Sequence, residues 1–256
     1  MVWQPEIDEL KHRQHLAAKM GGEENIARQR ARGKLTVRER IAGLVDPDSF
    51  DEIGGLTGRA TYDSDQKLES FTPESFVVGI CTLNGRKAII NAGDFTIRGG
   101  SGGYGPKGTY AEQLSMEGRL PYVRLLDATG GSVRHFEEIG RTYAISNVVG
   151  VQAARLLGMV PVASAVMGSV AGGPAIEACI SHFSVMVKGT SQIFPGGPPV
   201  VKAALGIDIT KEELGDERTQ VRKGGVIDNL AENEQEALDM IRRFLSYLPS
   251  NVWEVP

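Results

Sequence analysis

The sequence is poor in cysteine and has no long apolar run. Its two cysteines, Cys81 and Cys179, both lie in apolar stretches, so neither a zinc site nor the disulfide framework of a small secreted domain is expected. We expect two buried free thiols, which favours the reducing cytoplasm. No run of about eighteen apolar residues occurs, and the N-terminus turns polar and acidic where a signal peptide would be apolar. The sequence predicts a soluble cytoplasmic protein.

Blocks of like charge are missing too. The 28 Lys and Arg residues nearly balance the 32 Asp and Glu residues, and the formal net charge is −4. The most basic stretch, Arg28–Arg32, is too short and too mixed to indicate binding to nucleic acid or to an anionic membrane. We therefore expect no nucleic-acid partner, no membrane partner and no metal.

Side-chain motifs for catalysis are also absent. There is no G-x-S-x-G elbow, no HExxH and no Cys–His pairing motif. Of the four histidines, His12 and His15 fall in a polar N-terminal stretch, His182 precedes an apolar strand as a structural residue would, and His135 alone is placed near a possible crevice. A catalytic reading therefore favours backbone electrostatics with a base supplied from elsewhere.

Apolar periodicity divides the chain into three parts. Residues 1–45 predict a helical arm, interrupted at Gly21-Gly22 and followed by a short helix in which Thr36 and Glu39 have capping-box spacing. Residues 46–249 predict the main domain, with its body starting near Ser75, and residues 250–256 the start of a linker. Strands are expected at 76–83, 87–91, 122–126, 160–166 and 183–187, and helices near 137–157, 173–181, 197–205 and 234–247. This alternation indicates an α/β sheet covered on both faces.

Three glycine-dense turns follow apolar strands and lead toward helices. We call residues 94–103 turn 1, residues 127–132 turn 2 and residues 167–174 turn 3. Ligands of α/β sheets bind in the crevice beyond the carboxyl ends of the strands, so these turns are expected to line it. The candidate ligand-contacting residues are Gly99, Gly100, Ser101, Gly130, Gly131 and Ala171.

Turn 3 has the strongest chemical signal. Pro174 stands where the first turn of a helix tolerates proline, directly after Gly172 and Gly173. Glycine allows a ligand to approach the backbone, and amides at the start of a helix favour developing negative charge, such as the oxygen of a thioester enolate. Spacing alone leaves an even choice between this anion site and glycines that only permit close packing.

Several stretches, in order along the chain, resemble the carboxyltransferase component of biotin-dependent acyl-CoA carboxylases, of the propionyl-CoA carboxylase β-subunit type. The resemblance covers nearly the whole chain but only the N-terminal half of such a subunit. The matching stretches are residues 31–41, Asn84-Gly85-Arg86, Asp94-Phe95-Thr96, Gly99-Gly100-Ser101, residues 167–173, 183–188 and 199–203, and Glu212-Glu213-Leu214-Gly215.

The resemblance implies an α/β crotonase-like (ClpP/crotonase) ββα spiral that binds an acyl-CoA. It implies that Gly172 and Gly173 form an oxyanion hole for the acyl thioester, beside Ala171. The implied reaction moves a carboxyl group from carboxybiotin to the α-carbon of the acyl-CoA through an enolate. The implied partners are a C-terminal carboxyltransferase domain or subunit, which would hold biotin, a biotin carboxyl carrier protein, biotin carboxylase, and further copies in a homo-oligomer.

Two alternatives stay open at this point. One is an acyl-CoA decarboxylase subunit of the same fold. The other is a non-catalytic assembly subunit, because residues 128–131 read Ala-Thr-Gly-Gly where the family usually has Ser-Ala-Gly-Ala.

Overall fold

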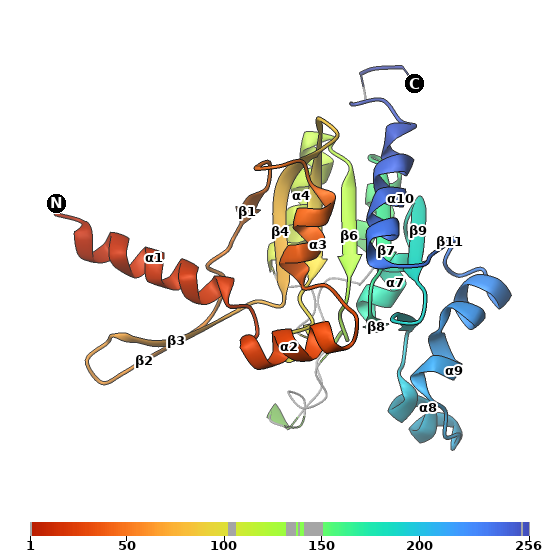
Figure 1. Ribbon diagram of the computed structural model, residues 1–256, viewed down its shortest axis with the longest axis horizontal. Coiled ribbons are helices and arrows are strands. Elements are labelled where there is room, and N and C mark those ends of the chain that lie inside the picture. Colours follow the sequence, from red (N-terminus) through yellow and green to blue (C-terminus); the bar gives the residue numbers. More distant parts are fainter. Residues whose placement is uncertain are drawn as a thin grey trace.

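The computed structural model describes residues 2–101, 106–131, 137, 139–140, 151–251 and 253–255. Its centre is a seven-stranded mixed sheet, in the order β1-β4-β5-β6-β7-β9-β11 (Figure 1). The strands from β5 to β11 are parallel, whereas β1, β4 and β5 pair antiparallel. The sheet strands are β1 (Asp51–Ile53), β4 (Phe76–Leu83), β5 (Arg86–Gly93), β6 (Tyr122–Leu126), β7 (Val162–Val166), β9 (Phe183–Val187) and β11 (Asn229–Ala231).

Helices cover both faces of this sheet, as its apolar strands predict. One face packs on α3 (Val37–Leu44) and α10 (Glu234–Ser246), through buried residues such as Ile41 and Leu238. The other face packs on α4 (Pro106–Gly118), α6 (Val151–Leu157) and α7 (Gly173–Cys179). Successive residues of β6 point to opposite faces, so Val123 and Leu125 meet the first layer and Tyr122 and Leu126 the second.

The remaining elements lie around this core. A short parallel pair consists of β8 (Ser169–Ala171) and β10 (Gln192–Phe194), and a separate antiparallel hairpin consists of β2 (Gly58–Tyr62) and β3 (Leu68–Pro73). Among the described residues, the other α-helices are α1 (Gln4–Ala18), α2 (Glu23–Ala31), α8 (Pro198–Leu205) and α9 (Lys211–Gly215), and two short turns of other helical types lie at Arg98–Gly100 and Arg218–Lys223. Within the described residues, no helix is both long and apolar enough to cross a membrane.

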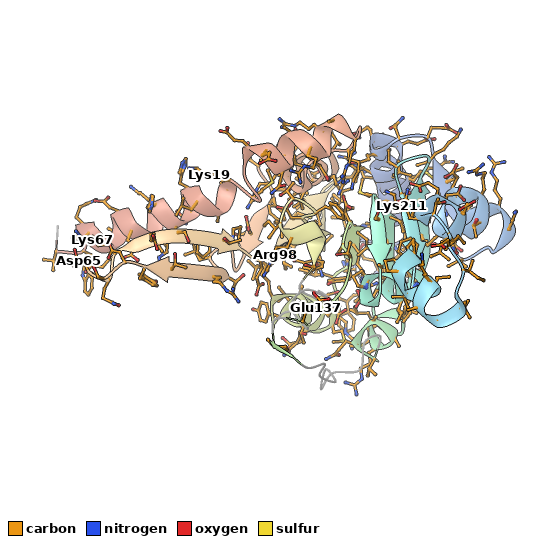
Figure 2. All side chains as sticks on the ribbon, turned by 90° about the horizontal axis from the view of Figure 1, so that it is seen from below. Lys19, Asp65, Lys67, Arg98, Glu137 and Lys211 are labelled. Carbon is orange, nitrogen blue, oxygen red and sulfur yellow. The ribbon has the colours of Figure 1, made fainter. Side chains whose placement is uncertain are left out.

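The helices of the N-terminal segment, residues 1–45, lie in two different environments. Helix α1 and the β2–β3 hairpin extend side by side from the body, with Lys19 toward the root and Asp65 at the hairpin tip (Figures 1 and 2). Arg13 of α1 donates a 2.6 Å hydrogen bond to the Tyr62 hydroxyl of the hairpin. In contrast, α3 begins at a capping box between Thr36 and Glu39, as its spacing predicts, and its apolar side lies in the main core. The division of the chain at residue 45 stays a prediction.

Three expectations need correction. The sheet begins at Asp51, not near Ser75, because the short polar edge strand β1 pairs with β4. The β2–β3 hairpin has no counterpart in the expected elements, since it is mostly exposed and lacks an apolar alternation. Cys81 is buried as expected, but Cys179 at the end of α7 is exposed, because only one side of that helix faces the core. Most of the expected helix at 137–157 lies outside the described residues, and its last part is α6.

Candidate active site

The three glycine-dense turns begin at the carboxyl ends of three neighbouring parallel strands. Turn 1 follows β5, turn 2 follows β6 and turn 3 follows β7, and the last residues of β6 and β7, Leu126 and Val166, are paired. Parallel neighbours end at the same edge of a sheet, so the turns meet there. The structure thus brings together the candidate residues of all three turns, in the part of each turn that is described.

Turn 1 is held against turn 2 by its glycines. The carbonyl of Gly99 accepts hydrogen bonds from the amide of Thr129 at 3.2 Å and from its hydroxyl at 2.9 Å. Gly100 has a φ of +67°, and a Cβ there would lie 2.5 Å from the carbonyl oxygen of Asp127. The buried hydroxyl of Ser101 donates to the carbonyl of Arg98 at 2.7 Å. Turn 1 therefore supports turn 2, and the hydroxyl of Ser101 already has a hydrogen-bond partner within turn 1.

Turn 2 touches turn 3 in the same way. The amide of Ala171 donates to the carbonyl of Ala128 at 3.0 Å. Gly130 has a φ of +72°, and a Cβ on it would lie 2.7 Å from the carbonyl oxygen of Ala171. Gly131 is exposed beside it. Only glycine permits this backbone approach, so Gly130 has a packing role, and the ligand contact expected of it stays a prediction.

The two glycines at the start of α7 differ in what their amides do. Gly172 has φ 68° and ψ −132°, and its amide donates to the carbonyl of Phe194 at 3.3 Å. Gly173 is the first residue of α7, and within the described residues its amide has no hydrogen-bond partner. Pro174 follows and has no N–H. In this conformation Gly173 thus offers a free donor, whereas the Gly172 donor must leave Phe194 before it can bind a ligand.

A buried network of four charged side chains lies beneath turns 2 and 3. Asp127, the first residue of turn 2, forms ion pairs with Lys34 at 2.6 Å and with Arg40 at 2.8 Å. Arg40 also pairs with Glu234 at 2.6 Å and donates to the carbonyl of Met167, the first residue of turn 3, at 2.9 Å. Burial lowers the pKa of Lys34, and the carboxylate of Asp127 opposes that effect. The network joins the N-terminal segment to the turns that carry the candidate residues.

Local sequence patterns do not predict this network. Lys34 and Arg40 fall in the stretch 31–41 that carries the family resemblance, and Asp127 opens turn 2, but their contacts bridge about ninety positions. The apolar periodicity of a helix assigns its charged residues to the solvent-exposed face. No local sequence pattern distinguishes a buried arginine from an exposed one.

A second buried charge cluster fixes α7 to the sheet. Arg124 of β6 donates to the carbonyl of Glu177 in α7 and to that of Ile180, which directly follows α7. Its guanidinium lies 3.5 Å from Glu112 of α4. Burial raises the pKa of the Glu177 carboxyl well above its usual value. This cluster supports α7 from the end opposite to Gly173.

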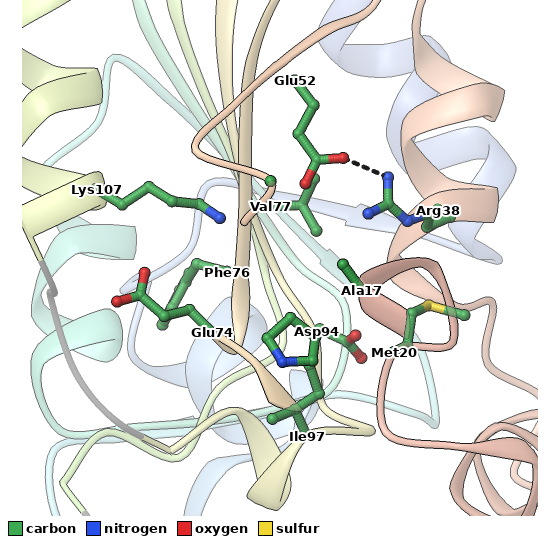
Figure 3. Close-up of a pocket in the computed structure, with 12 residues that line it drawn as sticks. Ala17, Met20, Arg38, Glu52, Glu74, Phe76, Val77, Asp94, Ile97 and Lys107 are labelled. Carbon is green, nitrogen blue, oxygen red and sulfur yellow. Dashed lines mark hydrogen bonds and ion pairs between the residues drawn. The ribbon is translucent and has the colours of Figure 1, made fainter. Parts of the chain in front are cut away.

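A small cavity lies on the other side of turn 1, between the root of the α1 arm and the sheet (Figure 3). Arg38 and Glu52 form a 2.7 Å ion pair at its edge, and the buried Lys107 donates to the carbonyl of Gly54. Burial raises the pKa of Asp94, whose carboxylate also lines the cavity. Turn 3 contributes nothing to this lining, so the cavity is distinct from the meeting point of the three turns.

The histidines take the places expected for them where they are described. His12 and His15 are exposed on α1. The Nδ1 atom of His182 accepts a 3.1 Å hydrogen bond from the amide of Val162, at the end of β7 opposite to turn 3, which confirms a structural role. His135 lies outside the described residues. Among the described residues, no group of three or more His, Cys, Asp and Glu side chains could hold a metal ion.

Comparisons with known proteins point to one family. The propionyl-CoA carboxylase carboxyltransferase subunit of Haloferax mediterranei is 33% identical over all of this chain and 49% of its own length. The methylmalonyl-CoA decarboxylase subunit alpha of Veillonella parvula is 34% identical over 96% of this chain and 48% of its own length. The chain therefore spans about half the length of the curated relatives it matches, consistent with the expected N-terminal half.

The fold comparison agrees. Transcarboxylase 12S, solved as a hexamer with methylmalonyl-coenzyme A bound, superimposes with a TM-score of 0.82 at 28% identity, over 98% of this chain and 49% of that one. The expected α/β crotonase-like fold with an N-terminal helical arm is confirmed. Residues 28–256 match the carboxyl transferase domain, and the chain belongs to that family.

Proposed function

We propose that this chain is the acyl-CoA-binding half of a biotin-dependent carboxyltransferase, which moves a carboxyl group to the α-carbon of an acyl-CoA. The observation that carries the proposal is the meeting of turns 1, 2 and 3, in which turn 2 contacts Ala171 just before Gly172 and Gly173, together with the amide of Gly173, which is free within the described residues. In this proposal the thioester carbonyl accepts a hydrogen bond from this amide, with Gly172 as a second donor once it leaves Phe194. Ala171, Gly130, Gly131, Gly99, Gly100 and Ser101 form the surrounding contact surface.

The chemistry of this chain is then electrostatic. Removal of the α-proton places negative charge on the thioester oxygen, and a fixed backbone donor stabilises that enolate by several kcal/mol. In the described part of the chain no histidine lies at the three turns, and His182 is bound at the opposite end of β7. The base is therefore assigned to the other half of the enzyme, which would also receive biotin from its carrier protein.

The proposed partners follow from this division of labour. A C-terminal carboxyltransferase domain or subunit completes the site, and a biotin carboxyl carrier protein and biotin carboxylase supply the carboxyl group. The relatives support this assembly by name, since one is a subunit of a biotin-dependent acetyl-/propionyl-coenzyme A carboxylase and transcarboxylase 12S is a hexamer. We propose a homo-oligomer, and the cytoplasm as its location.

Isothermal titration calorimetry with a matched ligand pair tests the proposal. S-propyl-CoA differs from propionyl-CoA only in having a methylene group in place of the thioester carbonyl. A backbone hydrogen bond to the carbonyl contributes about 1 kcal/mol, and the second donor, Gly172, contributes less because it must first leave Phe194. A sum of about 1.4 kcal/mol means that propionyl-CoA should bind about tenfold more tightly. Saturation at a hundredfold excess over the dissociation constant would also stabilise the fold by about 2.7 kcal/mol. Equal affinity for the two ligands would overturn the proposal.

A decarboxylase subunit is the second candidate, because the Veillonella parvula relative carries that name. Both reactions need the same enolate site, so ligand binding does not separate them. The two reactions are separated by an assay of the chain combined with its natural partners, which measures whether carbon dioxide is fixed or released. A non-catalytic assembly subunit is a third reading: it predicts that Gly172→Val and Gly173→Val leave the activity of the completed complex unchanged, whereas a catalytic turn predicts its loss.

A further inference from the structure

We propose that Lys34 is a positioning residue that sets the location of turn 3, and through it the amide of Gly173; this inference rests on the proposed function. Lys34 lies between α2 and α3, far from turn 3 in the sequence, and only 6% of its side chain is exposed. It touches no proposed ligand contact directly. Its influence passes through the residues that its ammonium group contacts.

The ammonium group of Lys34 meets all three turns. It lies 4.5 Å from the centre of the Phe95 ring in turn 1 and 2.8 Å from Oδ1 of Asp127 in turn 2. In turn 3, a Cβ added to Gly168 would lie 2.4 Å from Nζ of Lys34 and 2.0 Å from Oδ1 of Asp127. The absence of a side chain at residue 168 is therefore what allows turn 3 to close over the ion pair.

The charges of the network balance when Lys34 is present. The cations of Lys34 and Arg40 face the carboxylates of Asp127 and Glu234, and none of the four side chains is more than 6% exposed. A buried ion pair adds little net stability over apolar packing, but loss of one partner leaves an uncompensated charge. Without Lys34, the network carries an uncompensated negative charge, which favours a movement of the Asp127 carboxylate toward water. The backbone of Asp127 moves with it.

A displacement of Asp127 or Gly168 reaches the site within a few residues. Asp127 precedes Ala128, whose carbonyl accepts the hydrogen bond from the amide of Ala171. Gly168 precedes β8, which leads directly into Gly172 and Gly173. A donor that moves by about 1 Å loses most of its effect on a reacting group. The position of the hydrogen bond between Ala171 and Ala128 therefore controls the strength of the oxyanion site.

The test compares carbonyl-specific binding in Lys34→Met with that in the unmodified chain. We expect the tenfold preference for propionyl-CoA over S-propyl-CoA to fall to about twofold or less, while the affinity for S-propyl-CoA stays within about twofold, because only the carbonyl donor has moved. A merely structural role for Lys34 predicts lower stability with an unchanged preference. That result would overturn the inference.

Two further variants cover the possibility that Lys34→Met does not fold. The double variant Lys34→Met/Asp127→Asn keeps the buried network neutral, because Arg40 and Glu234 remain paired. Gly168→Ala displaces turn 3 sterically without changing any charge, and Gly158→Ala is its control, since a Cβ there meets only one atom at an ordinary 3.6 Å. Gly168→Ala is expected to lose the preference. Gly158→Ala is expected to keep it, and so is the double variant, because no uncompensated carboxylate remains at residue 127.

Hydrogen exchange measured by mass spectrometry separates this inference from the proposed function. In the ligand-free chain, Lys34→Met is expected to speed exchange at least tenfold in peptides covering 167–173, and to leave the β4–β5 hairpin at 76–93 unchanged. Unchanged exchange at 167–173 would overturn the positioning role even if no ligand binds. Equal affinities in the unmodified chain, together with faster exchange in the variant, would instead contradict the proposed function alone.

Discussion

The guanidinium of Arg40 lies 2.8 Å from the carboxylate of Asp127, and both side chains have no exposed surface. Arg40 is the fourth residue of α3, whereas Asp127 directly follows the central strand β6 and opens turn 2. The same guanidinium also reaches Glu234 at the start of α10 and the carbonyl of Met167. One side chain thus connects the N-terminal segment, the last helix and two of the three turns.

Arg40→Met is expected to destabilise the fold by about 3–5 kcal/mol, because it leaves Asp127 and Glu234 buried without their shared cation. Urea unfolding followed by circular dichroism measures this change. Arg242→Met is the matched control: Arg242 donates to the carbonyls of Gly43 and Leu44, holds α10 to α3, and carries no buried carboxylate as a partner. A loss for Arg40→Met no larger than for Arg242→Met would contradict the importance of the network.

Gly130→Ala is expected to separate turn 2 from turn 3. The new Cβ would lie 2.7 Å from the carbonyl of Ala171, and the φ of +72° disfavours any side chain. Gly189→Ala is its control, since Gly189 has a φ of +74° but open space around it, so its variant shows the backbone strain alone, about 1–2 kcal/mol. The unfolding free energy of Gly130→Ala should fall further than that of the control, and its affinity for propionyl-CoA should fall with it. Equal effects of the two variants would show that the contact between the turns is unimportant.

The two cysteines are expected to differ in reactivity. Burial, and to a smaller degree the nearby Asp46, raise the pKa of Cys81 to about 12, whereas Cys179 is exposed. The thiolate is the reactive form, so iodoacetamide at neutral pH should modify Cys179 in the native protein and modify Cys81 only after unfolding. Peptide mass spectrometry locates the label. Modification of Cys81 in the native protein, at a rate similar to Cys179, would contradict its burial between the sheet and α3.

The raised pKa of Cys81 also predicts a pH dependence of stability. The folded pKa of about 12 lies above the ordinary value of 9.0, so the thiol keeps its proton in the folded state while the unfolded chain loses it. This contribution to stability is complete below about pH 9 and declines as the pH rises toward 12. Between pH 9 and pH 10.5, Cys81→Ala should therefore lose stability less steeply than the unmodified chain, as measured by urea unfolding. Parallel pH curves would exclude a perturbed thiol at this position.

Thr36→Ala is expected to cost about 0.5–2 kcal/mol, because it removes the side-chain acceptor for the amide of Glu39 at the start of α3. The matched variant is Thr210→Ala, which removes an equivalent cap from the exposed five-residue helix α9. Since α3 contributes to the main core and α9 contributes little to it, the first variant should lower the melting temperature more. A larger effect at Thr210 would contradict the assignment of α3 to the core.

The local features of this protein could be predicted from its sequence. The hairpin turn at Asn84-Gly85, the cap at Thr36 and the helical start at Pro174 each depend on residues within four positions of one another. The apolar strands β4, β6 and β9 have the expected ranges because their side chains are buried on both faces of the sheet. The weakly apolar β1 and the β2–β3 hairpin have no such signal, so apolar periodicity does not predict them.

The amino-acid sequence by itself determined the α/β class, the three glycine-dense turns and the resemblance to carboxyltransferases, because these follow from local patterns and from the order of motifs. Only the tertiary structure decided how the turns meet and that Lys34 and Arg40 are buried beneath Asp127. It also decided that the Gly172 amide is held by Phe194, while the Gly173 amide has no partner in the described part of the chain. These contacts join positions far apart in the chain. Their energies depend on burial and distance, which arise only when the sheet brings the strand ends together.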